Sequence, residues 1–125
     1  MYKGKRNIFT NWDKEIYISS KKNETILDDF GNEITEYNKP TLYKFNIQPL
    51  SGYSDITAYG EKISRMYKAI IDIDYDGLFK EGDVAYLDGV TPKGEPKNGY
   101  NANYRIDSVR VQNLKIAIYF DKLQK

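Results

Sequence analysis

One run of acidic residues has the spacing of a calcium-binding loop. Asp72, Asp74 and Asp76 alternate, Gly77 follows, and Asp83 closes the pattern. Alternating carboxylates on a tightly turning loop, with a closing acid, converge on one hard cation. The surrounding sequence argues against a calcium-binding loop, because the residues before the pattern alternate like a strand, whereas an EF-hand needs an entering helix. The closing residue is also Asp rather than the usual Glu, so the residues favour a solvated strand end that runs into a glycine turn.

Other chemical equipment is sparse. The chain has no histidine and no cysteine, which removes the usual general base, zinc ligands, thiol nucleophiles and disulfides. Asp28 with Asp29, or Asp72 with Asp74, could be imagined as an acid–base pair for glycoside cleavage, but two carboxylates are a weak signal among 18 acids. We therefore predict that the protein is not an enzyme, and we assign it no catalytic, cofactor-binding or metal-binding residues.

The balance of basic and acidic residues indicates which classes of partner to expect. The chain carries 19 basic and 18 acidic residues, a net charge of +1, which argues against gripping nucleic acid through phosphates. Basic residues interleaved with aromatics, such as Lys62, Arg65 and Tyr67, are scattered and favour ordinary solvent-facing charge over single-strand binding. No apolar run approaches the ~20 residues that cross a bilayer, so no membrane partner is expected. Twelve tyrosines suit strands and also interfaces.

The elements that must position these residues form one expected domain. Residues 1–11 read as a basic N-terminal arm, and residues 12–125 read as a single β-barrel domain. Residues 15–19 predict a strand, and residues 25–37 predict a hairpin because Gly31-Asn32 supplies a tight turn.

Period-2 patterning is strongest in the middle of the chain. Tyr43, Phe45 and Ile47 share one face of a strand that should stop pairing near Pro49. Later strands are predicted at 67–73, 83–87 and 104–111, with a bulge near Ser108 where the inward face switches from Ile106 to Val109 and Val111. Residues 90–103 read as a surface loop, Asn113 as a tight turn, and Leu114, Ile116, Ile118 and Phe120 as the last inward face.

The fold class that follows is all-β. We predict a small barrel or sandwich of six to seven strands, interrupted at residues 51–65 by a long loop. Ile56, Tyr59, Ile63 and Met66 have spacings that allow a short helix within this loop, although Gly60 weakens it.

Several motifs, in their order and spacing, resemble the head–tail joining family of long-tailed bacteriophages, the head-closure or stopper proteins. The motifs are Asp29–Glu33, Ile47–Gly52, Tyr67–Ile71, Gly82–Gly89, Tyr104–Val109 and Asn113-Leu114. The resemblance spans about residues 16–123, although the loop at 90–103 is longer than this family leads us to expect.

The resemblance implies a structural protein of the virion neck that is made in the bacterial cytoplasm. Such a protein assembles with itself as a six- or twelve-fold cyclic ring below the portal and its adaptor. The ring closes the DNA-filled head and offers a surface to the tail terminator or tail-tube protein. Packaged DNA would pass through it without sequence-specific binding.

In this family a long loop between the second and third main strands points into the channel. The matching segment here is 51–65, and acidic or neutral walls would let DNA slide. The candidate channel residues are Ser51, Gly52, Tyr53, Ser54, Asp55, Tyr59 and Glu61.

The candidate contacts with adaptor or tail proteins lie in the N-terminal region and in the loop at 90–103. They are Lys5, Arg6, Phe9, Trp12, Lys93, Lys97 and Tyr100. Two alternatives stay open: another neck or tail-completion protein of a phage or tail-like particle, and a calcium- or ligand-binding β module.

Overall fold

The computed structural model describes residues 13–24, 26–50, 53–93 and 97–123. The strands are β1 (Asp13–Ser19), β2 (Ile26–Leu27), β3 (Glu33–Ile34), β4 (Thr41–Pro49), β5 (Met66–Asp72), β6 (Val84–Tyr86), β7 (Tyr104–Gln112) and β8 (Lys115–Lys122). The helical elements are α2 (Tyr53–Tyr59) and two 3-10 helices, η2 (Gly60–Arg65) and η3 (Ile73–Tyr75).

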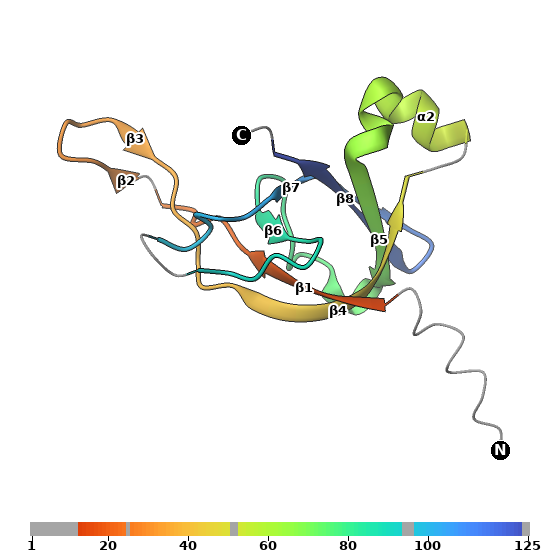
Figure 1. The fold of residues 1–125 in the computed structure, drawn as a ribbon. Coiled ribbons are helices and arrows are strands. Elements are labelled where there is room, and N and C mark those ends of the chain that lie inside the picture. Colours follow the sequence, from red (N-terminus) through yellow and green to blue (C-terminus); the bar gives the residue numbers. More distant parts are fainter. Residues whose placement is uncertain (1–12, 25, 51–52, 94–96, 124–125) are drawn as a thin grey trace, which may run out of the picture.

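Six strands pair antiparallel in a closed barrel, in the order β1–β4–β5–β8–β7–β6 (Figure 1). β1 closes it, because it pairs with β4 along one edge and with β6 along the other. The prediction of a small all-β fold is confirmed. No helix in the described ranges is both long and apolar enough to span a bilayer.

The barrel interior is filled by alternate residues of the six strands, as period-2 patterning requires. Phe45 and Ile47 of β4 are buried as predicted, and so are Ala69 and Ile71 of β5. The other fully buried side chains include Ile16, Ile106, Ile116, Ile118 and Phe120. The short strand β6 is buried on both faces, which explains why it reads as a continuous apolar run.

Aromatic side chains fill part of this interior around β4. Phe45 stacks on Tyr43 at 5.2 Å between ring centroids, and it meets Tyr75 edge-on at 5.3 Å and Phe79 edge-on at 5.9 Å. Edge-to-face packing places the positive ring edge against the negative ring face. Residues beyond β5 therefore return to the core and hold β4.

The bulge predicted near Ser108 is confirmed. The β7–β8 register shifts between Ile106, which faces Phe120, and Ser108, which faces Tyr119. One extra residue, Asp107, therefore lies in β7, and this changes which side chains point inward.

The end of the same strand pair differs from the prediction. Val111 and Leu114 were predicted to face the core, but they are 51% and 76% exposed. Asn113 and Leu114 are the two turn residues, with φ of 49° and 67°, so Leu114 is outside the pleat that sets the inward face. Val111 lies next to this turn and is exposed, although its cross-strand partner Ile116 is buried in the core.

The predicted hairpin at 25–37 is also confirmed. β2 and β3 form a separate two-stranded sheet that projects from the barrel between β1 and β4 (Figure 1). Gly31 has φ of 84°, which glycine adopts without steric penalty, so the turn falls where its sequence places it.

The long connection predicted at 51–65 contains the short helix that its spacing allowed, and this helix is more extensive than predicted. The structure is helical from Tyr53 to Arg65. Gly60 has φ of 55° and marks the change from α2 to η2. The glycine therefore ends one helix and starts another turn type, rather than preventing helix formation.

Candidate functional site

α2 and η2 together form an arm, called here the helical segment, that packs on the outer face of the barrel (Figure 1). Strand residues alternate between faces, so β5 and β8 present one set of side chains to the core and another to this segment. The contact is a small apolar cluster outside the main core. It consists of Leu50, Met66 and Tyr119, with Tyr59, Ile63 and Ala117 packed against them.

Tyr59 fixes the end of α2 to the barrel. Its aromatic ring lies 5.2 Å from that of Tyr119, and its hydroxyl lies 2.7 Å from Ser108 Oγ at the bulge. The Arg110 guanidinium lies over both rings, 5.6 Å from the centroid of Tyr59 and 5.2 Å from that of Tyr119. A cation over aromatic faces adds to the attraction. This predicted channel residue therefore turns toward the strands.

Two cations of the helical segment pair with acids of the barrel wall. Arg65 Nε lies 3.0 Å from Asp121 Oδ1, and Lys62 Nζ lies 3.5 Å from Asp121 Oδ2 and 3.4 Å from Asp107 Oδ1. Asp121 is 7% exposed, so its charge needs these partners. The bulge residue Asp107 adds a second carboxylate to the same contact.

Asp55 makes the contact at the beginning of the segment. Its Oδ2 accepts a hydrogen bond from Lys68 Nζ at 3.0 Å, and Asp55 is only 5% exposed. A buried carboxylate paired with lysine holds α2 against β5. Glu61 is exposed, so of the two acids predicted for a channel wall only Glu61 lies at the surface of this chain.

The other predicted channel residues lie just before these contacts. Ser51 and Gly52 fall outside the described residues, while Tyr53 and Ser54 form the first two positions of α2. The structure therefore brings Asp55 and Tyr59 to the barrel wall and leaves Glu61 exposed.

Three predicted partner contacts lie in the loop after β6, and all are exposed. The amide of Asn101 braces this loop, because its Nδ2 donates to the Thr91 carbonyl at 2.7 Å and its Oδ1 accepts from the Lys93 N–H at 2.9 Å. Lys97 and Tyr100 are exposed in the turn that follows, and Tyr100 is 54% exposed. The remaining predicted contacts, Lys5, Arg6, Phe9 and Trp12, lie outside the described residues.

Two acids of the calcium-like pattern, Asp72 and Asp83, serve separate structural roles. Asp72 pairs with Lys115 Nζ at 2.9 Å on the surface. Asp83 is buried and accepts hydrogen bonds from the N–H groups of Lys21 at 2.8 Å and Lys80 at 3.0 Å. In the described part of the chain, no three Asp or Glu side chains gather as a set that could hold a metal ion.

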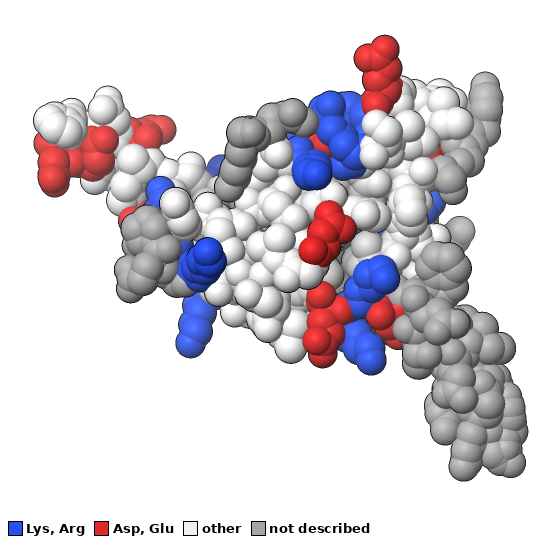
Figure 2. All heavy atoms as spheres, in the orientation of Figure 1, with Lys and Arg blue, Asp and Glu red and all other residues white. Residues whose placement is uncertain are grey.

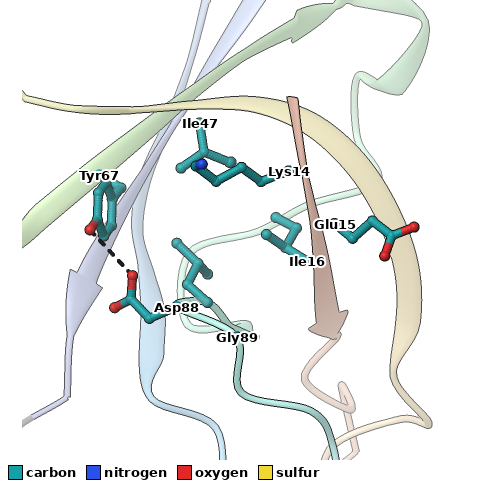
Figure 3. Close-up of a pocket in the computed structure, with 8 residues that line it drawn as sticks. Lys14, Glu15, Ile16, Ile47, Tyr67, Asp88 and Gly89 are labelled. Atoms are coloured by element: carbon teal, nitrogen blue, oxygen red, sulfur yellow. Dashed lines mark hydrogen bonds between the residues drawn. The ribbon is translucent and has the colours of Figure 1, made fainter. Parts of the chain in front are cut away.

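A cavity of about 300 Å³ opens at one end of the barrel. Lys14 and Ile16 of β1, Ile47 of β4 and Tyr67 of β5 line it, and Asp88 closes one side (Figure 3). The lining is mixed, with apolar strand residues next to Lys14 and the carboxylates of Glu15 and Asp88. Such a hollow can receive a side chain of another protein.

Asp88 links the two tyrosines at this barrel end. Its carboxylate accepts hydrogen bonds from the Tyr104 hydroxyl at 3.0 Å and the Tyr67 hydroxyl at 3.3 Å (Figure 3 shows the latter). Burial, together with the nearby Asp88 charge, raises the pKa of both tyrosine hydroxyls. The tyrosines therefore stay protonated donors and cap the barrel.

Sequence reasoning missed the tip of the β2–β3 hairpin. Phe30 is 89% exposed and Leu27 is 58% exposed, and acidic residues surround both in the sequence. The available signal was a phenylalanine inside a predicted turn, where it has no strand face on which to be buried.

A scan against protein-family models finds no match to this chain, and searches of curated proteins and of solved structures find no match either.

Proposed function

We propose that this protein is a structural subunit of a bacteriophage neck, which assembles as a ring below the portal and adaptor. The ring would close the DNA-filled head and offer a surface to the tail terminator or tail-tube protein. One observation carries the proposal: the connection between β4 and β5 is a helical segment laid on the barrel wall. The head-closure family that the sequence resembles has its channel loop at this place in the chain.

The use of polar side chains also favours a structural role. The buried acids Asp83 and Asp121 and the barrel-end Asp88 each hold backbone N–H groups, cations or tyrosine hydroxyls of the fold. An active site instead needs titratable groups that converge on a cavity with room for a substrate. The polar side chains described here stabilise the subunit and leave its surfaces for other proteins.

In this proposal α2 is the element that opens and closes the channel of the ring. η2 is anchored by Ile63 and by the Arg65–Asp121 pair, whereas α2 is held by Tyr59 and by Asp55 with Lys68. Gly60, at φ of 55°, lies between the two parts. We infer that α2 pivots at Gly60 when the tail signals ejection, breaking the Asp55–Lys68 pair, while η2 stays in place.

A deletion tests the gate. Removing residues 53–58 keeps the Tyr59 anchor and removes the part that would obstruct the channel, together with the Asp55–Lys68 pair. We expect such particles to lose packaged DNA before tail joining, measured as the DNA content of purified heads. The matched control is Tyr59→Phe, which keeps the obstruction and removes the hydroxyl bonds to Ser108 and Arg110. Heads that keep their DNA after the deletion, and eject it normally, would contradict the gate.

Electron microscopy of purified necks tests the assembly. A cyclic ring of this chain between adaptor and tail supports the proposal, and its location elsewhere in the tail would favour another tail-completion protein. A calcium titration tests the remaining rival, because a cation that binds only the folded state raises its melting temperature. An unchanged melting temperature in millimolar calcium contradicts a calcium-binding module.

A further inference from the structure

The charge of this chain is divided between the hairpin and the rest. Residues 23–36 contain five acidic residues and no basic residue, so this stretch carries −5. The remainder keeps 13 of the 18 acidic residues together with all 19 basic ones, and therefore carries +6. Figure 2 shows the acidic side chains gathered on the projecting hairpin, away from the barrel. Two parts of one molecule with opposite charges attract between copies.

The hairpin presents an apolar side chain in a fixed position. Phe30 is 89% exposed at the turn, beside the exposed Leu27. The Asp28 carboxylate accepts hydrogen bonds from the N–H groups of Phe30 and Asn32, both at 2.9 Å, and these bonds lower the pKa of Asp28. A preorganised turn loses little conformational entropy on binding. Buried aromatic anchors with charged surroundings are typical of binding hot spots.

The barrel has a hollow of matching character. It has a volume of about 450 Å³ and lies between η2 and the end of the barrel that holds Asp88. Leu50, Ile63 and Met66 provide apolar lining, Arg65 and Lys122 provide positive charge, and Asp88 adds one carboxylate. Arg65 is paired with Asp121, so Lys122 is the cation that acids of another copy can meet. Figure 2 shows basic side chains over this part of the molecule. The hollow therefore offers an apolar space for an aromatic ring and Lys122 for its acidic neighbours.

We propose that the hairpin of one copy docks in this hollow of the next copy. Phe30 enters the apolar space, while Asp29 and Glu33 face Lys122. The occupant is a second copy of this chain, because the chain itself carries both complementary charges. Since the two contact surfaces differ, the contact is head-to-tail and repeats around an axis until it closes. The inference rests on the proposed ring and names the contact that builds it.

Engineered cysteines test the contact directly, because the chain has no cysteine of its own. Asp29→Cys protein is mixed with Ser64→Cys protein, whose cysteine lies in the hollow, and a short bis-maleimide is added. The control replaces Ser64→Cys with Gln112→Cys, an exposed position at the opposite end of the β7–β8 pair. We expect the first pair to give a mixed dimer in about tenfold higher yield than the control.

Charge reversal then identifies the charged side chains that make the contact. Asp29→Lys with Glu33→Lys, or Lys122→Glu alone, should each reduce the cross-link yield about tenfold in a Ser64→Cys background paired with Asn32→Cys, an exposed position in the same turn. Combining the two reversals across the contact should restore it. Phe30→Ser should reduce the yield by a similar factor while leaving the melting temperature unchanged, since Phe30 is exposed.

The outcomes separate this inference from the proposed neck function. Equal yields for the Ser64 and Gln112 pairs, with rings visible in the electron microscope, would overturn the hairpin contact and leave the neck function standing. Specific cross-links in a protein that forms rings or filaments outside any neck would support the contact and contradict the neck function. Loss of yield that charge reversal across the contact does not restore would overturn the assigned groups.

Discussion

Two segments are added to the barrel, and they differ in how much of their apolar surface they bury against it. The helical segment between β4 and β5 lies on the barrel wall through Tyr59, Ile63 and two ion-paired cations. The hairpin between β1 and β4 meets the rest of the molecule near its base, where the Lys21 N–H donates to Asp83 and Tyr37 packs against the cluster of Val84, Tyr86 and Ala102. One addition shares its apolar surface with the barrel, and the other exposes its largest apolar side chain.

This difference separates a segment that is stabilised by the barrel from a segment that is available to bind a partner. Because its contacts are buried with the barrel, the helical segment should unfold with the barrel unless these contacts are broken first. The hairpin has few such contacts, so it can change or bind a partner with little effect on the barrel. Mutations that weaken one addition should therefore leave the other intact, and this difference can be measured.

The largest expected effect comes from Asp83, which joins the hairpin base to the barrel. Asp83→Ala leaves the N–H groups of Lys21 and Lys80 without their acceptor, and we expect the free energy of unfolding to fall by about 3 kcal/mol. Urea unfolding measures this. The control Asp72→Ala removes an exposed pair with Lys115 and should change it by less than about 0.5 kcal/mol. Equal effects of the two variants would contradict the role of Asp83.

The second largest loss of stability should come from substitution of Tyr59, because Tyr59 anchors the helical segment. We expect Tyr59→Ala to lower the free energy of unfolding by about 2 kcal/mol through lost packing on Tyr119 and the lost bond to Ser108. Tyr59→Phe should lose about 1 kcal/mol. Hydrogen exchange should show amides of residues 55–65 exchanging faster in Tyr59→Ala, with the hairpin unchanged. Unaltered protection of these residues would show that Tyr59 is not the anchor.

Alkaline pH should weaken the barrel through its capped end. Burial and Asp88 raise the pKa of Tyr104, so above about pH 10 the unfolded chain loses this proton while the folded chain keeps it. The folded state then binds more protons, and its stability falls as pH rises, by up to about 1 kcal/mol per pH unit. Thermal melts between about pH 9 and about pH 11 measure the slope. Tyr104→Phe should reduce it, and an unchanged slope would assign the loss to other groups.

The smallest effect should come from Asp28, within the hairpin. Its pKa is lowered by the N–H groups of Asn32 and Phe30, so this contribution is present at neutral pH and is lost as pH falls below about 4. Asp28→Ala should speed exchange of the Phe30 and Asn32 amides at neutral pH and leave the melting temperature unchanged. Asp29→Ala is the matched control. A lower melting temperature for Asp28→Ala alone would mean that the hairpin supports the barrel after all.

Local patterns predicted what depends on neighbouring residues. The change from Ile106 to Val109 as inward residues indicated a bulge, because one added residue reverses the alternation of a strand. The hairpin turn followed from Gly31 for a similar local reason. The all-β fold then followed from the number of alternating runs.

The candidate site depends on contacts that no local pattern contains. Tyr59 meets Ser108 and Arg110 across almost half of the chain, and Asp55 finds Lys68 only after α2 folds back. Gly60 was interpreted as a weak point in a helix, although its positive φ joins two helical pieces. Asp83 was assigned to a calcium-like spacing because its partners, Lys21 and Lys80, are visible only in the closed barrel.

Closure of the barrel by β6 also governs how the chain acquires its shape. β1 finds β6 only after most of the chain has been made, whereas the β7–β8 pair forms across a two-residue turn. Distant pairs form late because they must first bring the ends of a long loop together. Until β6 arrives, one edge of β1 is open to strand addition by other nascent chains. Slow refolding and concentration-dependent misfolding should therefore respond to changes in this three-residue strand far more than its length suggests.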